Sequence, residues 1–321
     1  MLNTPILFLV FNRPDTTRQV FAKIREIQPK QLFIAADGAR EGKEGEQEKV
    51  HEVRKLILEG IDWDCEVKTL FRDKNLGCGK AVSEGITWFF ENVEQGIILE
   101  DDCLPESSFF PFCEKMLEKY KYNQKILMIT GTNYLFGLQK EDVDYYYSSL
   151  CAIWGWATWR RAWELHNSKI QNIDRKRIKE KYINQYFVNF IYKMIRSTIE
   201  DDLDTWDSLW LYNFIIHNGL SITPIKNQIK NLGYNGAHAN NDTSPFINMP
   251  TEIITHIENL KSSNKISPNN YLDKIAIKNI VKGDKLKISF YQKIKLSLSN
   301  QKLRVKSYVL KFSKKDKKKT S

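Results

Sequence analysis

The sequence lacks any long hydrophobic run. No apolar stretch among the 321 residues approaches the roughly 18 to 20 residues that a membrane-spanning helix requires. The first residues, MLNTPILFLVFNRPD, have an apolar core too short for a secretory signal and no basic flank. We therefore expect a cytoplasmic protein. With 42% hydrophobic and 27% charged residues, the composition is that of an ordinary globular protein of one large or two modest domains.

Cysteine is scarce and scattered. The cysteines are odd in number and include no C-x-x-C pair, so the sequence indicates neither a disulfide framework nor a zinc site. We expect them to be reduced and mostly packed. Internal repeats are also absent, which excludes a repeat architecture. The five cysteines are Cys65, Cys78, Cys103, Cys113 and Cys151.

Positive charge is missing from most of the chain, although the net charge is +10. Residues 261–321 hold 18 Lys and Arg against 3 Asp, a balance of +15, which leaves −5 for residues 1–260. A domain that binds nucleic acid more often carries its basic surface on the folded body. We therefore expect no nucleic-acid partner.

The basic excess lies in a C-terminal extension, residues 251–321. Its segment ISFYQKIKLSLSNQKLRVKSYVLKF places apolar residues at near-helical spacing with lysines elsewhere around the turn. A basic amphipathic helix of this kind binds an anionic membrane surface, which would put the protein on the inner face of the plasma membrane. A tail that packs on the body and ends in a solvated charge run explains the same pattern.

Short apolar runs alternate with helix-like stretches through the first 130 residues. Such alternation predicts parallel strands joined by right-handed helical crossovers, with helices on both faces of the sheet. We therefore predict an α/β fold with a mostly parallel central sheet. The expected strands are residues 5–11, 31–37, 65–71, 96–100 and 125–131, and the expected helices are residues 15–27, 46–58 and 80–92.

Beyond residue 131 the amino-acid composition changes. Residues 150–212 hold six of the eight tryptophans, and no linker separates them from the part before. We expect residues 1–130 and 131–250 to be two halves of one domain, with residues 251–321 as the extension.

Polar clusters follow directly after four of the expected strands: FNRPD, ADGAR, FRDKNLG and EDD. In open α/β sheets ligands bind at the carboxyl ends of the strands. The four clusters would therefore share one edge of the sheet, which is the strongest indication of a site that the residues themselves offer.

Glu100, Asp101 and Asp102 end a buried run with three repelling charges. Mg²⁺ and Mn²⁺ prefer carboxylate oxygens and commonly take only one or two from the protein, which leaves positions for substrate phosphates. One Asp on a metal and another on a ribose hydroxyl would explain the run. The alternative is a helix N-terminus, capped by Asp102 or Ser107.

The other three clusters each allow two interpretations. Arg13 could clamp a diphosphate or simply pair with Asp15. Asp37 could accept from a nucleobase or ribose, or serve an Asp-Gly turn. In RDKNLGCGKA, Gly77 and Gly79 would allow close backbone approach with Arg72 and Lys80 facing phosphate, or would form a plain turn before a helix.

The tryptophan-rich half supplies a candidate base. Asp207 in DTWDSLW lies beside Trp206 and could take a proton from an attacking hydroxyl. Asp204 is more naturally the N-cap of the helix that follows. Gly155 between Trp154 and Trp156 would present a flat apolar face to a sugar, or the rings are core. His238, in a polar loop, could reach a metal or phosphates, or be solvated.

FNRP, ADG, NLGCGKA, ILEDD, WGW and TWDSLW, in this order, resemble the nucleotide-sugar glycosyltransferases of the GT-A fold over roughly residues 5–240. They are most similar to the inverting N-acetylglucosaminyltransferase I-like group and related bacterial polysaccharide enzymes. The resemblance implies a Rossmann-like GT-A sheet, with residues 1–130 binding the nucleotide-sugar and residues 131–250 the acceptor.

The resemblance also implies roles. Asp102 would bind Mn²⁺ or Mg²⁺, with His238 as a further ligand from a loosely matching loop. Asp207 would be the catalytic base. The acceptor sugar would meet Trp154, Gly155, Trp156 and Trp206. Glu100 and Asp101 would support the metal and the ribose, Asp37 would meet the uracil or ribose, and Arg13 would lie along the nucleotide. From the polar clusters themselves we further expect the nucleotide-sugar to be bound by Asn12, Arg72, Asn75, Gly77 and Lys80.

The leading hypothesis is a metal-dependent inverting hexosyl- or N-acetylhexosaminyltransferase. Its donor would be a UDP-sugar and its acceptor a glycan or lipid-linked glycan in bacterial surface polysaccharide or lipopolysaccharide synthesis. A sugar-phosphate nucleotidyltransferase is weakened by the missing glycine-rich loop after the first strand. A non-catalytic carbohydrate-binding module would explain the tryptophans but leave the three acids and Asp207 without a role.

Overall fold

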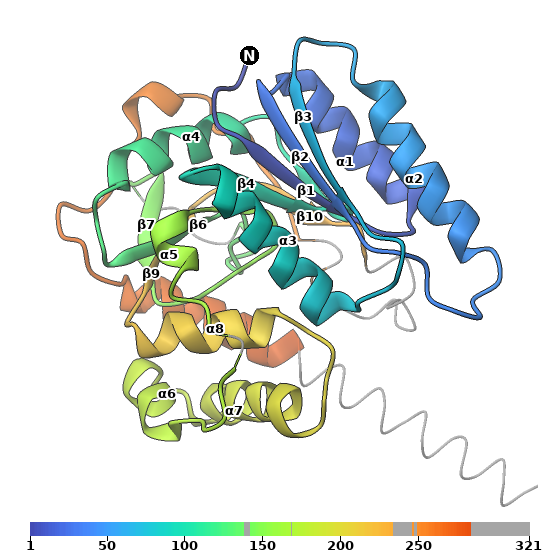
Figure 1. The fold of residues 1–321 in the computed structure, drawn as a ribbon. Coiled ribbons are helices and arrows are strands. Elements are labelled where there is room, and N and C mark those ends of the chain that lie inside the picture. The colour runs from blue at the N-terminus through green and yellow to red at the C-terminus, as the bar shows by residue number, and fades with distance from the viewer. Residues whose placement is uncertain (138–141, 168, 234–245, 247–248, 284–321) are drawn as a thin grey trace, which may run out of the picture.

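The structure is a computed structural model that describes residues 1–137, 142–167, 169–233, 246 and 249–283. Its centre is an eight-stranded sheet in the order β3-β2-β1-β4-β8-β6-β9-β7, and β5 and β10 form a separate two-stranded ribbon (Figure 1). The strands are β1 (Ile6–Val10), β2 (Gln31–Ala36), β3 (Glu66–Phe71), β4 (Gln95–Glu100), β5 (Cys103–Pro105), β6 (Ile126–Thr130), β7 (Tyr145–Ser148), β8 (Trp156–Trp159), β9 (Leu220–Pro224) and β10 (Ile229–Asn231).

Helices connect and cover these strands. Residues 270–283 are also helical. No described helix is both long enough and apolar enough to span a membrane. The helices are α1 (Pro14–Ile27), α2 (Glu46–Gly60), α3 (Cys78–Asn92), α4 (Phe109–Tyr120), α5 (Arg160–Trp163), α6 (Arg175–Lys181), α7 (Gln185–Glu200), α8 (Asp207–Ile216) and the short 3₁₀ helix η2 (Ile257–Asn259).

The sheet is mostly parallel. Strands β3, β2, β1 and β4 run side by side in one direction. Strand β8 is antiparallel to both β4 and β6, so β6 and its parallel neighbour β9 run with β1, while β7 is reversed. Two of the eight strands therefore oppose the other six, and the predicted α/β class is confirmed.

Both faces of the sheet are covered, which explains why β1 is apolar at every position. Ile6, Phe8 and Val10 pack in one core cluster with buried residues of α1, α2 and α4. Leu7 and Leu9 pack in another with residues of α3 and α8. Figure 1 shows α3 crossing one face, with α1 and α2 on the other side of the sheet. A strand buried on both faces reads as a continuous apolar run, not as an alternation.

A third core lies between α6, α7, α8 and the helix of residues 270–283. It forms the lower part of the molecule in Figure 1. A buried carboxylate ties this helix to β7: Asp273 accepts from the hydroxyls of Ser148 and Ser149 at 2.5 and 2.6 Å and from the backbone N–H of Ser149 at 2.8 Å. The beginning of the predicted C-terminal extension is therefore part of the folded body.

Glu100, the last residue of β4, and the two acids after it do not open a helix. The chain turns at Asp101 and Asp102 and enters β5, which pairs antiparallel with β10. Helix α4 begins only at Phe109, and no side chain caps it at Ser108. The alternative in which Asp102 or Ser107 caps a helix is therefore wrong. Strand β5 itself is too short for an apolar period to reveal it.

Candidate active site at the carboxyl edge of the sheet

Strands β1, β2, β3 and β4 are parallel neighbours, so their carboxyl ends lie along one edge of the sheet. The segments FNRPD, ADGAR, FRDKNLG and EDD begin at these ends, as expected. The structure therefore brings together the loops that the sequence singled out in the first half of the chain.

Arg13 supplies the positive charge that two of the three acids need. Its guanidinium donates from Nη1 to Asp102 Oδ2 at 2.7 Å and from Nη2 to Asp101 Oδ1. The backbone N–H of Phe11 donates to Asp101 Oδ2 at 3.2 Å. Pro14 holds the first position of α1, and Arg13 is the residue before it. The partners of Arg13 are thus Asp101 and Asp102, not Asp15.

Burial sets the charge state of this ion pair. Asp101 is only 2% exposed, and burial raises the pKa of its carboxyl to about 6 although Arg13 favours the charged form. Burial alone would lower the pKa of Arg13, but the two carboxylates outweigh it and the pKa of Arg13 is raised. Removal of Arg13 would leave two carboxylates together with no cation.

Glu100 is the third acid, and its carboxylate is not paired with Arg13. Within the described residues its carboxylate has no hydrogen-bond or ion-pair partner. Burial, followed by the charges of Asp102 and Asp101, raises the pKa of Glu100, and Asp207 adds to the effect while Arg13 opposes it. Three acidic groups therefore meet at this edge, Arg13 is bonded to two of them, and a cation bound beside them would favour their charged forms.

The end of β2 holds a loop in place. Asp37 is buried, and its carboxylate accepts backbone N–H groups of Gly38, Leu76 and Gly77 at 3.0 to 3.1 Å. Asn75 donates from its side chain to the carbonyl of Gly38 at 2.8 Å. Asp37 and Asn75 thus fasten the loop before α3 to the sheet. Their predicted contacts with a nucleotide stay predictions.

The remaining polar residues of this half pair with helix side chains. Asn12 donates to Glu46 at 2.8 Å, and Glu46 also binds Arg40 at 2.5 Å. Arg72 and Lys80 lie 3.3 and 3.8 Å from the carboxylate oxygens of Glu84 on α3. Arg40 and Glu46 were not predicted, because nothing in EGKEGEQEKV separates Glu46 from its acidic neighbours.

Asp207, the candidate base, is the first residue of α8. Its Oδ1 accepts from the hydroxyl of Thr205 at 2.5 Å and from the backbone N–H of Ser208 at 2.7 Å. Its charge acts on Glu100 across the edge of the sheet. The structure therefore brings together the two acidic regions that the sequence placed more than 100 residues apart.

Cys78 marks the place where these charges meet. It is the first residue of α3, and burial, followed by the charges of Glu100, Asp204 and Asp207, raises the pKa of its thiol to about 12. The thiol is therefore protonated near neutral pH and is no nucleophile. The charges that act on Cys78 thus come from the end of β4 and from residues before and at the start of α8.

Asp204 caps a different helix from the one expected. Cys78 and Gly79 are the first residues of α3, and their backbone N–H groups donate to the carboxylate of Asp204 at 2.8 and 2.7 Å. Helix α8 begins after Trp206 without a side-chain cap. The prediction that Asp204 caps α8 is therefore wrong. In the sequence, Gly77 and Gly79 indicated that another group comes close to the backbone here, and that group is the Asp204 carboxylate.

Two of the predicted acceptor tryptophans are core residues. Trp156 is 0% and Trp206 is 2% exposed, and their rings stack at 5.8 Å with an interplanar angle of 19°. Gly155 has φ +60°, and a Cβ there would lie 2.4 Å from Ile229 and 3.3 Å from Leu99. The structure thus realises the alternative in which Trp156 and Trp206 pack, and it makes Gly155 a close-packing position.

Trp154 lies elsewhere. It is partly exposed and joins an aromatic cluster with Tyr134 and Phe246, at centroid distances of 5.9 and 6.0 Å. Phe136 extends the cluster, 6.0 Å from Phe246. Trp154 precedes β8, next to the carboxyl end of β4, since Trp156 pairs with Ile98. Of the predicted aromatic residues, Trp154 alone reaches the surface near the acids.

Two predictions lie outside the described residues: His238 as a metal ligand, and the basic segment from residue 284 onward. Among the described residues, no group of three or more His, Cys, Asp or Glu side chains is arranged to hold a metal ion. Mg²⁺ and Mn²⁺ sites that take one or two carboxylates and complete their coordination with substrate phosphates need no such group. Glu100 and Asp102 are the two carboxylates that such a site would use, and the predicted metal ion stays a prediction.

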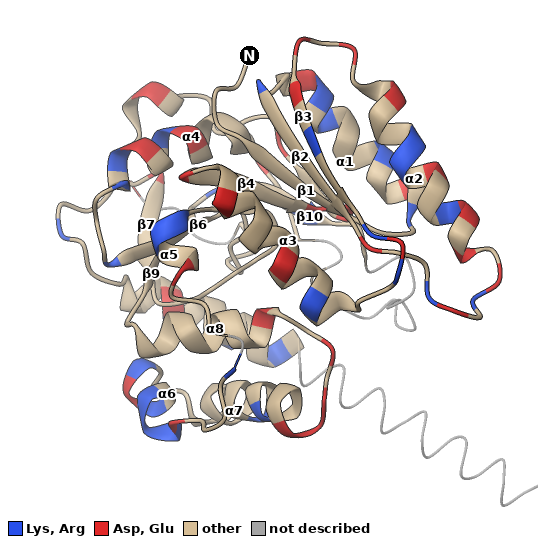
Figure 2. Cartoon of the chain, viewed as in Figure 1, with Lys and Arg blue, Asp and Glu red and all other residues tan. Residues whose placement is uncertain are grey.

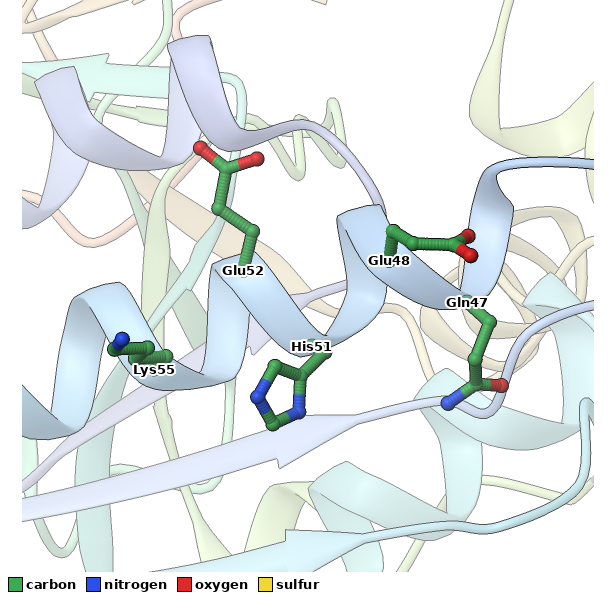
Figure 3. A pocket seen from close by; sticks show the side chains of 5 residues that line it. All are labelled: Gln47, Glu48, His51, Glu52 and Lys55. Carbon is green, nitrogen blue, oxygen red and sulfur yellow. The ribbon is translucent and has the colours of Figure 1, made fainter.

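The surface also has hollows outside this edge. One is lined by Gln47, Glu48, His51, Glu52 and Lys55, all from a single helix, α2 (Figure 3). A second lies between α3 and α5, where His166 stacks on Trp163 at 4.4 Å and burial lowers the pKa of His166 to about 4. Neither contains residues of the candidate site.

No protein-family model matches the chain, and no curated protein matches it. Similar solved structures include UDP-glucose pyrophosphorylase in complex with UDP-glucose, at 9% identity and TM-score 0.37, covering 72% of this chain and 92% of that one. Mouse xyloside xylosyltransferase 1, apo form, has 8% identity and TM-score 0.30, covering 67% and 81%. HddC from Yersinia pseudotuberculosis has 10% identity and TM-score 0.26, covering 45% and 57%. At these TM-scores the fold description rests on the strand order itself.

Proposed function

We propose that the chain is a glycosyltransferase that moves a sugar from a nucleoside diphosphate donor, a UDP-sugar first of all, to a glycan acceptor with inversion at C1. The observation that carries the proposal is the meeting of Glu100, Asp101, Asp102 and Arg13 at the end of β4 with Asp207 at the start of α8. This arrangement supports a role for the residues at the end of β4 with the leaving diphosphate and a role for Asp207 with the acceptor.

Asp207 would act on the acceptor. A carboxylate within reach of a hydroxyl can accept its proton as the oxygen attacks C1 of the donor sugar. The bond from C1 to the diphosphate oxygen breaks in the same displacement, and that oxygen keeps the electron pair. Thr205 and Ser208 leave Oδ2 of Asp207 without a described hydrogen bond, so this oxygen is the one available to the acceptor.

The residues at the end of β4 would serve the donor. Glu100 and Asp102 would hold Mn²⁺ or Mg²⁺, which stabilises the negative charge that develops on a departing diphosphate. Arg13 keeps Asp101 and Asp102 in place and presents the only guanidinium bonded to them among the described residues. Asp101, buried and bonded to Phe11, acts here as a fixed support.

The competing functions are less well supported. The loop after β1 contains no glycine between Asn12 and Ile27, which is unlike a phosphate-cradling nucleotidyltransferase loop. A carbohydrate-binding module would need exposed rings, whereas Trp156 and Trp206 are in the core. Neither alternative gives Asp207 a role opposite Glu100.

The test is transfer and donor hydrolysis by the purified chain across UDP-, GDP- and CMP-sugars, with Mn²⁺, Mg²⁺ or EDTA. We expect turnover of one donor class, and Asp207→Asn should retain donor binding while it loses about 100-fold or more in transfer rate. Asp201→Asn, an exposed acid at the end of α7, is the matched control and should keep wild-type activity. Turnover of no donor by the wild type would refute the proposal.

We also propose that the acceptor is lipid-linked, in bacterial surface polysaccharide or lipopolysaccharide synthesis, and that the basic extension binds an anionic membrane. Residues 284–321 carry 13 Lys and Arg against 2 Asp. The folded body adds Arg175, Lys176, Arg177 and Lys179, exposed on α6 (Figure 2). Cosedimentation with phosphatidylglycerol vesicles should fall when residues 286–321 are removed, and unchanged partitioning would contradict the membrane role.

A further inference from the structure

One contact joins the two halves of the candidate site through the backbone. Asp204, in the loop between α7 and α8, accepts from Cys78 N–H at 2.8 Å and from Gly79 N–H at 2.7 Å. The first N–H groups of a helix have no partner within the helix, and α3 has no side-chain cap of its own at Gly77. A carboxylate is the favoured occupant of such a position, because the helix dipole attracts negative charge.

The sequence around α3 is shaped to admit this carboxylate. Gly77 has φ +83°, a conformation that side chains rarely adopt, and a Cβ there would lie 2.4 Å from Asp204 Oδ2. A Cβ at Gly79 would lie 3.0 Å from Asp204 Oδ1. The two preceding N–H groups, of Leu76 and Gly77, bind Asp37. Four successive backbone donors are thus held by two carboxylates, one from each half of the chain.

Asp204 stands three residues before Asp207, and the segment between them is held at several points. Trp206 is buried against Trp156 in the core. Thr205 Oγ1 and Ser208 N–H orient the carboxylate of Asp207. Beside the packing of Trp206 and Trp210, the contact of Asp204 with α3 therefore helps to fix the start of α8 against the donor half.

We propose that Asp204 is a positioning residue: by binding the first turn of α3 it sets the distance between Asp207 and the acids at the end of β4. The inference rests on the proposed function, since it assigns to Asp204 the placement of the candidate base. Asp204 itself touches neither donor nor acceptor in this account. A displacement of about 1 Å at a reacting group can cost about 100-fold in rate.

The variants are Asp204→Ala, which removes both acceptors, and Asp204→Asn, which keeps one oxygen in a residue that caps helices well. We expect Asp204→Ala to lower kcat about 10- to 100-fold while the dissociation constant for the donor, from calorimetry, stays within about twofold. Asp204→Asn should recover most of the lost kcat. Asp201→Ala, an exposed acid in the same loop region, is the control and should match the wild type.

A second measurement is independent of activity. Backbone hydrogen exchange over residues 76–81 should accelerate in Asp204→Ala and stay unchanged in Asp201→Ala. Unchanged exchange, an unchanged kcat in Asp204→Ala, or a melting temperature that falls with kcat and is not restored by Asp204→Asn would each overturn the positioning role. If the wild type turns over no donor while exchange accelerates as expected, the proposed function is wrong. The contact of Asp204 with α3 would then be a structural contact with no role in catalysis.

Discussion

The candidate-site acids of the two halves are held in different ways. In residues 1–130, Asp37 and Asp101 are buried and bonded to backbone N–H groups of loops at the carboxyl edge of the sheet, and Arg13 ties Asp101 to Asp102. In the second half, the described hydrogen bonds of the Asp207 carboxylate are those to Thr205 and Ser208, its own neighbours in sequence. The first set is fixed by the sheet, whereas the second depends on how a whole helix is packed.

This difference has a consequence for function. A charged group fixed by the sheet edge is in place before any ligand arrives, and preorganisation of this kind is what stabilisation of a leaving group needs. A base carried by α8 follows the packing of Trp206 and Trp210 and the contact of Asp204 with α3. We therefore expect substitutions of charged residues to have the larger effects in the first half, and substitutions of buried apolar residues to have the larger effects in the second.

The largest effect is expected for Arg13→Ala. It leaves Asp101 buried without its cation, and breaking such a pair should lower the free energy of unfolding by about 2 to 4 kcal/mol. The control is Arg18→Ala on α1, whose contact with Glu52 is exposed and 3.8 Å long, and about 0 to 1 kcal/mol is expected there. Urea denaturation gives both values, and equal losses would show that Asp101 does not depend on Arg13.

The sequence predicted the first half well because its signals are local. Each strand of the parallel sheet is an apolar run, and each run ends where polar residues begin, so the shared edge follows from β1 to β4 alone. The presence of Arg13, Asp101 and Asp102 at this edge was therefore expected. Their mutual ion pair was not, because Asp15 is an equally plausible partner in the sequence.

The second half was harder for a physical reason. Whether a tryptophan lies in the core or at the surface depends on contacts between segments far apart in the chain, such as Trp156 with Trp206 and Trp210. Likewise Asp204 and α3 are 125 residues apart, and a helix cap is predictable only when it precedes its own helix. Local periodicity carries no record of either contact.

A substitution in the tryptophan cluster tests the role of packing. Trp156→Phe removes ring volume from a fully buried site, and about 1 to 3 kcal/mol of the free energy of unfolding should be lost. Trp154→Phe, at the partly exposed cluster with Tyr134, should cost about 1 kcal/mol or less. Thermal or urea denaturation ranks the two variants. The reverse order would contradict the role of Trp156 as a core residue.

Acid titration should distinguish two carboxylates, Glu46 and Asp273, whose pKa values are shifted in opposite directions. The Arg40 hydrogen bond lowers the pKa of Glu46 to about 2, so Glu46 stabilises the fold above its ordinary pKa of 4.5 and this contribution disappears as the pH falls from 4.5 to about 2. Burial raises the pKa of Asp273 above 3.8 despite the bonds from Ser148 and Ser149. Its contribution is therefore present below pH 3.8 and is lost as the pH rises through its folded pKa.

Glu46→Gln and Asp273→Asn should therefore change the pH dependence of stability in opposite directions. Between pH 5 and pH 3 the wild type loses stability through Glu46, and Glu46→Gln should flatten this loss by about 1 to 2 kcal/mol, since Arg40 is half exposed and solvent screens the pair. Asp273→Asn removes a group that favours the folded state in acid, so its loss over the same range should be steeper than that of the wild type. Urea unfolding at three or more pH values measures both slopes. Slopes that change in the same direction would mean that burial does not dominate the pKa of Asp273.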